Sequence, residues 1–131
     1  METYKVTVDE EGTIRWYNAD GKLHRLNGPV VERMDGSKEY YKNGKLHRED
    51  GPAIEYSDGY KAYYKEGKKH REDGPAVEYD GGSKEYWINN KQLTEEEFNN
   101  RTKKELTAAE IEELLGYSIK VVKGYPKDYF F

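Results

Sequence analysis

The chain has 131 residues, of which 37% are charged and only 34% are hydrophobic. It contains no cysteine, which excludes disulfides, thiol catalysis and cysteine-ligated zinc, and no apolar run approaches the roughly 20 residues of a membrane-spanning helix. The net charge of −4 is spread over the whole length, so we expect neither a membrane nor a nucleic acid as a partner.

Aromatic residues give this charge-rich chain the means to fold. Thirteen tyrosines, two tryptophans and three phenylalanines make up 14% of the sequence, and each ring buries a large area when it packs. We therefore expect a folded protein with a thin core that is spread over many aromatic contacts. The first segment, METYKVTVDEEG, is acidic and has no apolar stretch, so we expect a cytoplasmic location rather than secretion.

A 23-residue tandem repeat occupies residues 4–93. The segments GKLHRLNGP, GKLHREDGP and GKKHREDGP begin at Gly21, Gly44 and Gly67. Three residue types keep the same phase in these segments: His24, His47 and His70; Arg25, Arg48 and Arg71; Pro29, Pro52 and Pro75. Recurrence at this period indicates that the chain stacks one structural unit several times.

Each repeat predicts two short antiparallel strands. In the central repeat these are residues 53–56 and 61–65, and Asp58-Gly59 between them favours a tight turn. The Gly-Pro step links one hairpin to the next, because proline lacks the N–H that a central strand needs. With ~4.8 Å between strands, each repeat would advance about 10 Å. The sequence therefore predicts a mainly β fold, an antiparallel β-hairpin solenoid over residues 1–93.

After Leu93 the sequence changes from a strand pattern to a helix pattern. Two capping boxes are present, in which a threonine and a glutamate three residues later satisfy each other's backbone N–H groups. They are formed by Thr94 with Glu97 and by Thr107 with Glu110. We therefore expect helices at residues 95–104 and 108–115, and a strand at 118–123.

Residues 94–131 are accordingly expected to form a separate domain, a small C-terminal α+β cap. A solenoid needs its open end covered, and such a cap would cover it. The last seven residues, 125–131, include four aromatic residues, which either pack down or dock a partner. A homodimer through this C-terminal region is therefore an open alternative.

The repeat resembles a known family. The pattern N-G-K-x-H-x-x-G, followed by an Asp-Gly turn and an aromatic pair, is similar to the MORN repeat, and the variant H-R-x-x-G-P-[AV] resembles short tandem-repeat proteins of bacteriophages and other large DNA viruses. The resemblance covers about residues 4–93. The sequence departs from the usual pattern in its Gly-Pro step and in having arginine where glycine commonly follows the histidine. The family implies a β-hairpin solenoid with an interaction role and no common enzyme activity.

The recurring polar residues favour a structural role over chemistry. Equivalent histidines would lie about 10 Å apart, too far to share one zinc ion, so we expect each histidine and its arginine to brace the neighbouring repeat. Glu49-Asp50 has the phase of Leu26-Asn27, which argues for turn and surface residues instead of acid–base pairs. No motif for catalysis or phosphate binding is present. We expect no enzyme activity, no metal and no cofactor.

The aromatic pairs and the arginines are the candidate partner-binding residues. Neighbouring side chains on a strand point to opposite faces, so one ring of each pair can pack while the other forms an exposed ladder. Alternatively, both ladders are needed for packing. Tyrosine, tryptophan and arginine are enriched at binding hot spots. The candidates in the central repeats are Tyr40, Tyr41, Tyr63, Tyr64, Tyr86, Trp87, Arg48 and Arg71.

Three functions follow as hypotheses. The first is a non-catalytic, phage-encoded inhibitor that occludes a host protein, such as a component of a bacterial defence system; this target rests on the resemblance. The second is a sponge that sequesters a nucleotide-like signalling ligand between arginine and aromatic side chains. The third is an oligomeric structural or interaction protein.

Overall fold

The computed structural model describes residues 3–102 and 106–118. The chain divides into two compact units, Met1–Asn99 and Asn100–Phe131. Helix α1 (Glu95–Asn100) is almost wholly part of the first unit. The division therefore lies beyond the boundary expected after Leu93, because α1 is grouped with the repeats.

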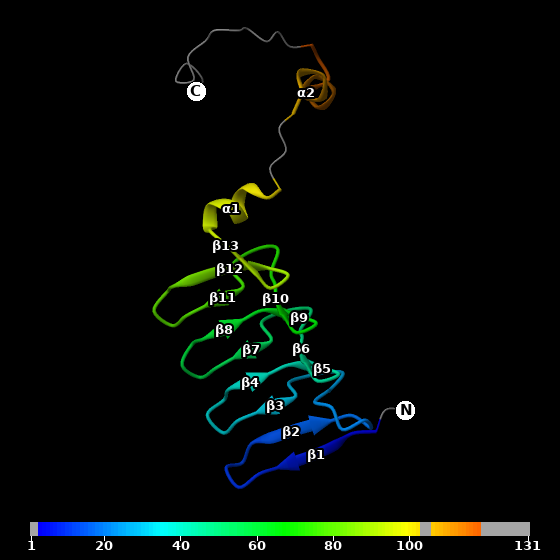
Figure 1. Cartoon of the computed structure of the whole chain (residues 1–131), viewed down its shortest axis with the longest axis vertical. Coiled ribbons are helices and arrows are strands. Elements are labelled where there is room, and N and C mark those ends of the chain that lie inside the picture. Colours follow the sequence, from blue (N-terminus) through cyan, green and yellow to red (C-terminus); the bar gives the residue numbers. More distant parts are fainter. Residues whose placement is uncertain (1–2, 103–105, 119–131) are drawn as a thin grey trace. The chain divides into compact units, whose positions relative to one another are not determined.

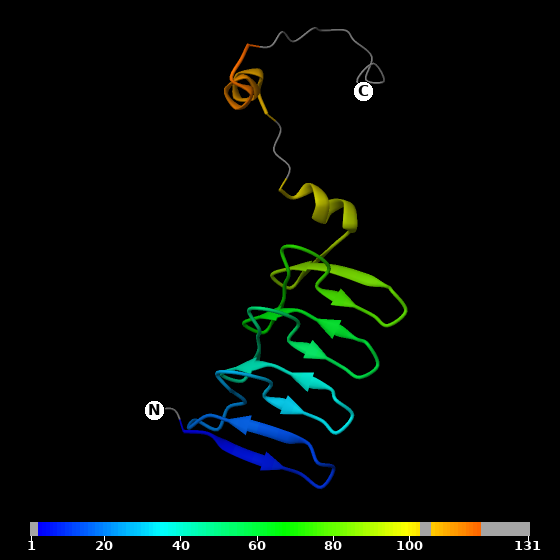
Figure 2. The same ribbon diagram turned by 180° about the vertical axis from the view of Figure 1, so that it is seen from behind.

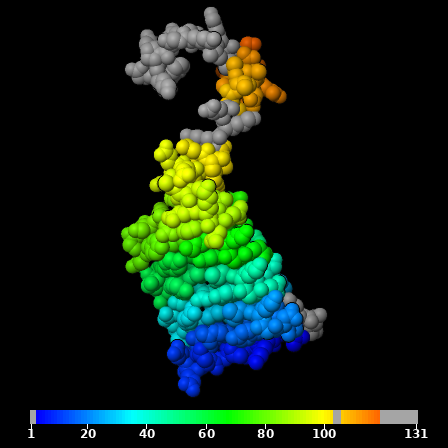
Figure 3. Space-filling view, in the orientation of Figure 1, coloured from blue at the N-terminus to red at the C-terminus, as the bar shows by residue number. Residues whose placement is uncertain are grey.

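The first unit is a stack of β-hairpins, as predicted, and its repeats follow one another in chain order (Figures 1 and 3). Nine antiparallel strands form the main sheet in the order β1-β2-β3-β4-β7-β8-β11-β12-β13. They are β1 (Lys5–Val8), β2 (Ile14–Tyr17), β3 (Val31–Glu32), β4 (Lys38–Glu39), β7 (Ile54–Glu55), β8 (Lys61–Ala62), β11 (Val77–Glu78), β12 (Lys84–Ile88) and β13 (Lys91–Leu93).

Two smaller sheets lie beside the main one, and their presence corrects the prediction of two strands per repeat. They pair β5 (Tyr41–Lys42) with β6 (Lys45–Leu46), and β9 (Tyr64–Lys65) with β10 (Lys68–Lys69).

The expected strand 61–65 is divided at Tyr63. The Tyr63 N–H donates to the Ala76 carbonyl oxygen of the main sheet (2.7 Å), whereas the Tyr63 carbonyl oxygen accepts from the N–H of His70 (3.0 Å). The chain therefore leaves the main sheet and enters a small hairpin at Tyr63.

The small hairpins turn through two residues with positive φ. In the first complete one, φ is 50° at Asn43 and 83° at Gly44, the signature of a type I′ turn. The equivalent turns use Glu66-Gly67 and Asn89-Asn90. Asparagine and glycine tolerate this conformation, which explains why Asn-Gly sits at the first of these turns.

The register of the main sheet sorts its side chains into two rows, because residues directly opposite on neighbouring strands share a face. One row is largely aliphatic: Arg15, Val31, Glu39, Ile54, Ala62, Val77 and Glu85. The other row, which we call the charged row, consists after Ile14 of alternating acids and bases: Glu32, Lys38, Glu55, Lys61, Glu78 and Lys84.

The core is built from small aliphatic residues. Ile54, Ala62 and Val77 form a buried cluster on the aliphatic row, and Ala53 and Ala76, which follow the Gly-Pro steps, are fully buried on the opposite face. Aromatic rings surround this small core: Tyr60, Tyr64 and Trp87 pack against the cluster while remaining partly exposed. This agrees with the expectation of a thin core that is spread over many aromatic contacts.

The two capping boxes form as predicted. Thr94 and Glu97 exchange hydrogen bonds of 2.9 and 3.0 Å at the start of α1, and Thr107 caps α2 (Ala108–Leu115), which ends at Gly116 with φ 76°. Helix α1 is shorter than the expected 95–104, and residues 103–105 lie outside the described residues. No helix in the described ranges 3–102 and 106–118 has the length and apolar character to cross a membrane.

Aromatic residues pack at both ends of the repeat stack. Phe98 of α1 is buried, and its ring lies 4.7 Å from that of Tyr86. At the other end, the Tyr4 ring lies 5.6 Å from Trp16, and its hydroxyl accepts from the N–H of Leu26. The rest of the expected cap consists of a strand at 118–123 and the aromatic end at 125–131. Apart from Ser118, these residues lie outside the described residues.

Candidate binding surface

Each recurring arginine is held on an aromatic ring of the preceding repeat. The guanidinium carbon of Arg48 lies 3.8 Å from the centre of the Tyr40 ring. Its Nη1 donates to the Pro52 carbonyl oxygen (3.1 Å) and to Glu55 (3.0 Å). The same arrangement occurs twice more, with Arg25 over Trp16 near Pro29, and with Arg71 over Tyr63 near Pro75. These arginines are therefore already engaged by cation–π contacts and by hydrogen bonds within the protein.

The glycine of the motif makes room for the arginine. A Cβ atom added to Gly51 would lie 3.0 Å from the guanidinium carbon of Arg48, and one added to Gly74 would meet Arg71 at the same distance. Neither glycine has positive φ, so the close approach is the reason for glycine here. The spacing H-R-x-x-G-P thus describes one packing unit: arginine, the glycine beneath it, and the proline carbonyl that it binds.

Each histidine braces the next repeat, as predicted. Nδ1 of His47 accepts from the N–H of Glu66 at 2.9 Å, and in the next residue the Gly67 N–H donates to the Leu46 carbonyl oxygen at 2.8 Å. His24 and His70 accept in the same way from the N–H groups of the next turns, at 3.0 Å each. Both N–H groups of a positive-φ turn are therefore capped by the preceding repeat.

These contacts leave the histidines apart from one another. In the described ranges, no group of three histidine, cysteine or acidic residues could hold a metal ion. The expectation that the protein needs no metal stays a prediction.

The arginine face, which we define by Trp16, Tyr40, Tyr63, Arg25, Arg48 and Arg71, has a shallow groove between successive repeats. One groove lies between Arg25 and Arg48, and its equivalent lies between Arg48 and Arg71. Carboxylates stand at the rims; Asp50, for example, accepts from Nε of Arg48 at 3.2 Å. The charged row on this face alternates in sign, so the face has no concentrated positive charge to attract an anion.

The opposite face bears a continuous group of rings. This tyrosine face consists of Tyr41, Tyr56, Tyr60, Tyr64, Tyr79 and Trp87, together with Glu39 and Glu85. The Tyr60 ring is stacked 5.5 Å from Tyr56 and lies edge-on 5.4 Å from Tyr79. Tyr56 and Tyr79 are 38% and 40% exposed, and they border an open depression with Ile54 at its floor. Apolar rings are thus accessible over neighbouring repeats.

Two carboxylates accept hydrogen bonds from the hydroxyl and indole groups of the tyrosine face. Glu39 is buried and accepts from the Tyr41 hydroxyl (2.7 Å) and from Nη1 of Arg33 (2.6 Å). Glu85 accepts from Nε1 of Trp87 (2.9 Å) and from the Tyr79 hydroxyl (2.8 Å).

These bonds and the burial of the rings shift several pKa values. The Trp87 hydrogen bond is the main cause that lowers the pKa of Glu85. Burial, followed by the hydrogen bond to Glu39, raises the pKa of Tyr41. Glu85 is therefore charged and Tyr41 is neutral at neutral pH.

A paired change in the central repeat creates the middle of the tyrosine face. The outer repeats have serine and glutamate at two aligned positions, Ser37 with Glu39 and Ser83 with Glu85, whereas the central repeat has Tyr60 and Ala62. Alanine leaves the space beside the core that the Tyr60 ring uses, and the ring packs against the core cluster.

The eight residues predicted as a binding site do not form one surface. Tyr40, Tyr63, Arg48 and Arg71 lie on the arginine face; Tyr41, Tyr64 and Trp87 lie on the tyrosine face; Tyr86 lies against Phe98. Every member of these pairs is half-buried. The structure thus favours the alternative in which both ladders are needed for packing, over one packed and one exposed ladder.

Sequence reasoning missed Tyr56, Tyr60 and Tyr79. They lie near the turns of the long hairpins, outside the recurring aromatic pairs. The paired change to Tyr60 and Ala62 was the available signal, because an alignment of the three repeats displays it.

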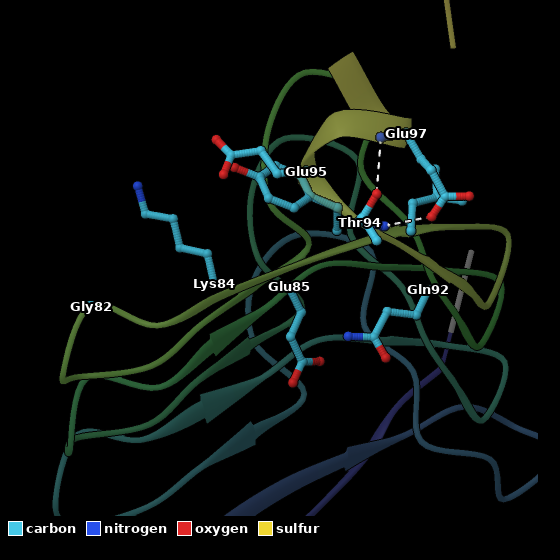
Figure 4. Close-up of a pocket in the computed structure, with 9 residues that line it drawn as sticks. Gly82, Lys84, Glu85, Gln92, Thr94, Glu95 and Glu97 are labelled. Carbon is cyan, nitrogen blue, oxygen red and sulfur yellow. Dashed lines mark hydrogen bonds between the residues drawn. The ribbon is translucent and has the colours of Figure 1, made fainter. Parts of the chain in front are cut away.

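A further depression lies at the last hairpin, between β12, β13 and the start of α1 (Figure 4). Glu85 and Gln92 point to one side of the strand pair and Lys84 to another. Its three acidic side chains have internal partners: Glu97 accepts from the Thr94 N–H, Glu85 accepts from Trp87, and Glu95 accepts from the Tyr86 hydroxyl. The depression therefore has no converging set of reactive groups.

Replacing Gly51→Ala should destabilise the protein by about 1–3 kcal/mol, the usual range for overpacking, because the new methyl group displaces the Arg48 guanidinium. Gly81→Ala is the matched control, since nothing lies within 4 Å of its added Cβ atom and its φ is not positive. The control should change the free energy of unfolding by less than about 0.5 kcal/mol. Urea denaturation measures both, and equal values for the two variants would contradict this role of the glycine.

The free energy of unfolding should fall as the pH rises from about 10 to about 12. Burial raises the pKa of Tyr60 to about 12, whereas a tyrosine in the unfolded chain titrates at about 10. In this window the unfolded state binds fewer protons than the folded state, so stability declines with pH. Tyr60→Phe removes this proton, and its stability, normalised to pH 7, should decline less. The free energy of unfolding is measured by urea denaturation at each pH. An equal decline with pH in Tyr60→Phe and in the unchanged protein would contradict the prediction.

The chain matches no protein-family model, no curated protein and no solved structure. The geometry of the repeats, with an arginine face occupied by internal contacts and a tyrosine face with accessible rings, is therefore the basis on which function is inferred.

Proposed function

We propose that the chain is a non-catalytic, cytoplasmic protein-binding module that contacts a protein partner through the tyrosine face. The observation that carries the proposal is the accessible cluster of Tyr56, Tyr60 and Tyr79. Rings of this kind supply large contact areas at low entropic cost, and their hydroxyl groups supply hydrogen bonds, which is why tyrosine is enriched at interfaces.

The rigidity of the tyrosine face supports the same proposal. Glu39 and Glu85 hold the hydroxyl groups of Tyr41 and Tyr79, and the core cluster holds Tyr60 from below. A preformed aromatic surface loses little side-chain entropy when a partner docks.

The contacts of the arginines support a ligand sponge less well. A phosphate-binding groove needs guanidinium groups that can turn toward the ligand. Arg48 and Arg71 lie on tyrosine rings and donate to proline carbonyl oxygens and glutamates instead. A nucleotide would have to displace these contacts.

The biological role within this proposal is occlusion of a host protein by a phage-encoded inhibitor, with a defence protein as the target. The support for this role is the resemblance of H-R-x-x-G-P repeats to tandem-repeat proteins of bacteriophages. The third hypothesis, an oligomeric structural protein, is distinguished by assembly beyond two copies in the absence of any partner.

The test begins with affinity capture of a partner from a bacterial lysate and continues with calorimetric titration of the purified pair. Tyr79→Ala and Tyr56→Ala should each weaken binding about 30-fold, equivalent to about 2 kcal/mol for a hot-spot ring. Lys61→Ala, on the charged row of the other face, should bind like the unchanged protein, because exposed charges contribute little. Melting curves of all variants verify that they fold.

Unchanged affinity in both tyrosine variants, together with loss of binding in Arg48→Ala, would place the contact on the arginine face and contradict the proposal. Stabilisation by nucleotides in a melting assay, without a captured protein, would favour the sponge instead.

A further inference from the structure

Strand β1 forms an open edge of the main sheet. It pairs with β2 on one side, and no other described residue of the first unit lies beyond it (Figures 1 and 2). Val6 and Val8 of this strand are 46% and 66% exposed. Edge strands with exposed β-branched residues are templates for pairing with another strand, and natural proteins usually protect them.

The outward-facing backbone groups of β1 belong to Val6 and Val8. The N–H of Asp9 donates to the Thr13 carbonyl oxygen on the β2 side, whereas the N–H of Trp16 in β2 donates away from β1, to Val30. Hydrogen-bonding direction alternates along an antiparallel strand. Thr7 and Lys5 therefore bond to β2, and the N–H and C=O groups of both valines point out of the sheet.

We propose that β1 pairs in antiparallel fashion with β1 of a second copy of this chain, about a two-fold axis at Thr7. In this register Val6 lies opposite Val8 of the second copy, and the two exchange backbone hydrogen bonds. Lys5 lies opposite Asp9 of the second copy, which places opposite charges across from each other. Thr7 lies opposite Thr7 of the second copy. Each residue of the strand thus finds a compatible partner.

The neighbouring registers that preserve the hydrogen-bonding direction fit less well. A shift by one step in one direction places Val6 opposite Glu10, and a shift in the other direction places Val8 opposite Tyr4 and Val6 opposite itself. Both shifts lose the pairing of Lys5 with Asp9.

The assembly stops at two copies. The opposite end of the stack leads directly into α1, where Phe98 packs on Tyr86, so the two ends of the stack differ. A two-fold contact that uses the same surface on both copies is closed and leaves no second β1 edge for a third copy. The short interface is small, so we expect a dimer that forms in a concentration-dependent way.

The absence of native cysteine makes a direct test simple, because Thr7→Cys introduces the single thiol of the chain. At the two-fold axis the two Cα atoms of a non-hydrogen-bonded pair lie about 4.5 Å apart, within reach of a disulfide. Mild oxidation of the full chain should give a disulfide-linked dimer. Lys61→Cys, an exposed position in the middle of the sheet, is the control and should cross-link only at the background rate of random collisions.

A second variant tests the pairing without a covalent cross-link. Val6→Pro removes an outward N–H and leaves the bonds between β1 and β2 in place, since proline is tolerated where the N–H faces away from the sheet. Sedimentation should show a monomer–dimer equilibrium for the unchanged chain and a monomer for Val6→Pro with the same circular dichroism spectrum. A chain that is monomeric at ~1 mM, or a dimer that persists in Val6→Pro while Thr7→Cys cross-links no faster than Lys61→Cys, would overturn the proposal.

Discussion

The fold depends on how each small turn is capped by the repeat before it. A type I′ turn with positive φ at two successive residues directs two adjacent N–H groups at the preceding layer. That layer supplies one histidine Nδ1 and one main-chain carbonyl oxygen as acceptors. Nδ1 of His24 accepts from the Asn43 N–H, and the Leu23 carbonyl oxygen accepts from the Gly44 N–H; the same pair of bonds recurs one and two repeats later. Because strands of two residues bury little surface, this capping adds to the pairing of β4 with β7 and of β8 with β11 in fixing each layer on the next.

The arginine unit adds a further link between layers, on one face of the sheet. Arg48 reaches from the Tyr40 ring of one layer to the carbonyl oxygen of Pro52 and the carboxylate of Glu55 in the next. Because Gly51 has no side chain, it leaves space for the Arg48 guanidinium. The motif that recurs most strictly in the sequence thus makes structural contacts between the layers. The positions that vary among the repeats, such as Tyr60 and Ala62, are the ones that shape the accessible surface.

Much of the fold could be predicted because its determinants are local and periodic. The phase of the histidines predicted the bracing of neighbouring repeats, and the two Thr-x-x-Glu boxes predicted the start of both helices. The division of a strand at Tyr63 could not be predicted, because Tyr63-Tyr64 looks like a continuous strand and the break depends on where the N–H of Tyr63 finds its acceptor, in a different repeat. The candidate surface was missed because Tyr56, Tyr60 and Tyr79 lie outside the recurring aromatic pairs. Within those pairs, alternation places neighbouring rings on opposite faces without telling which face lies over the core.

Amide hydrogen exchange of the full chain, compared with His47→Ala, tests the central claim that histidines hold the layers together. In the unchanged protein the amide hydrogens of Asn43, Glu66 and Asn89 should all be protected although these turn residues are exposed. In His47→Ala the protection should disappear at Glu66 and persist at Asn43. Rapid exchange at all three positions in the unchanged protein, or equal protection of Glu66 in both proteins, would contradict the account.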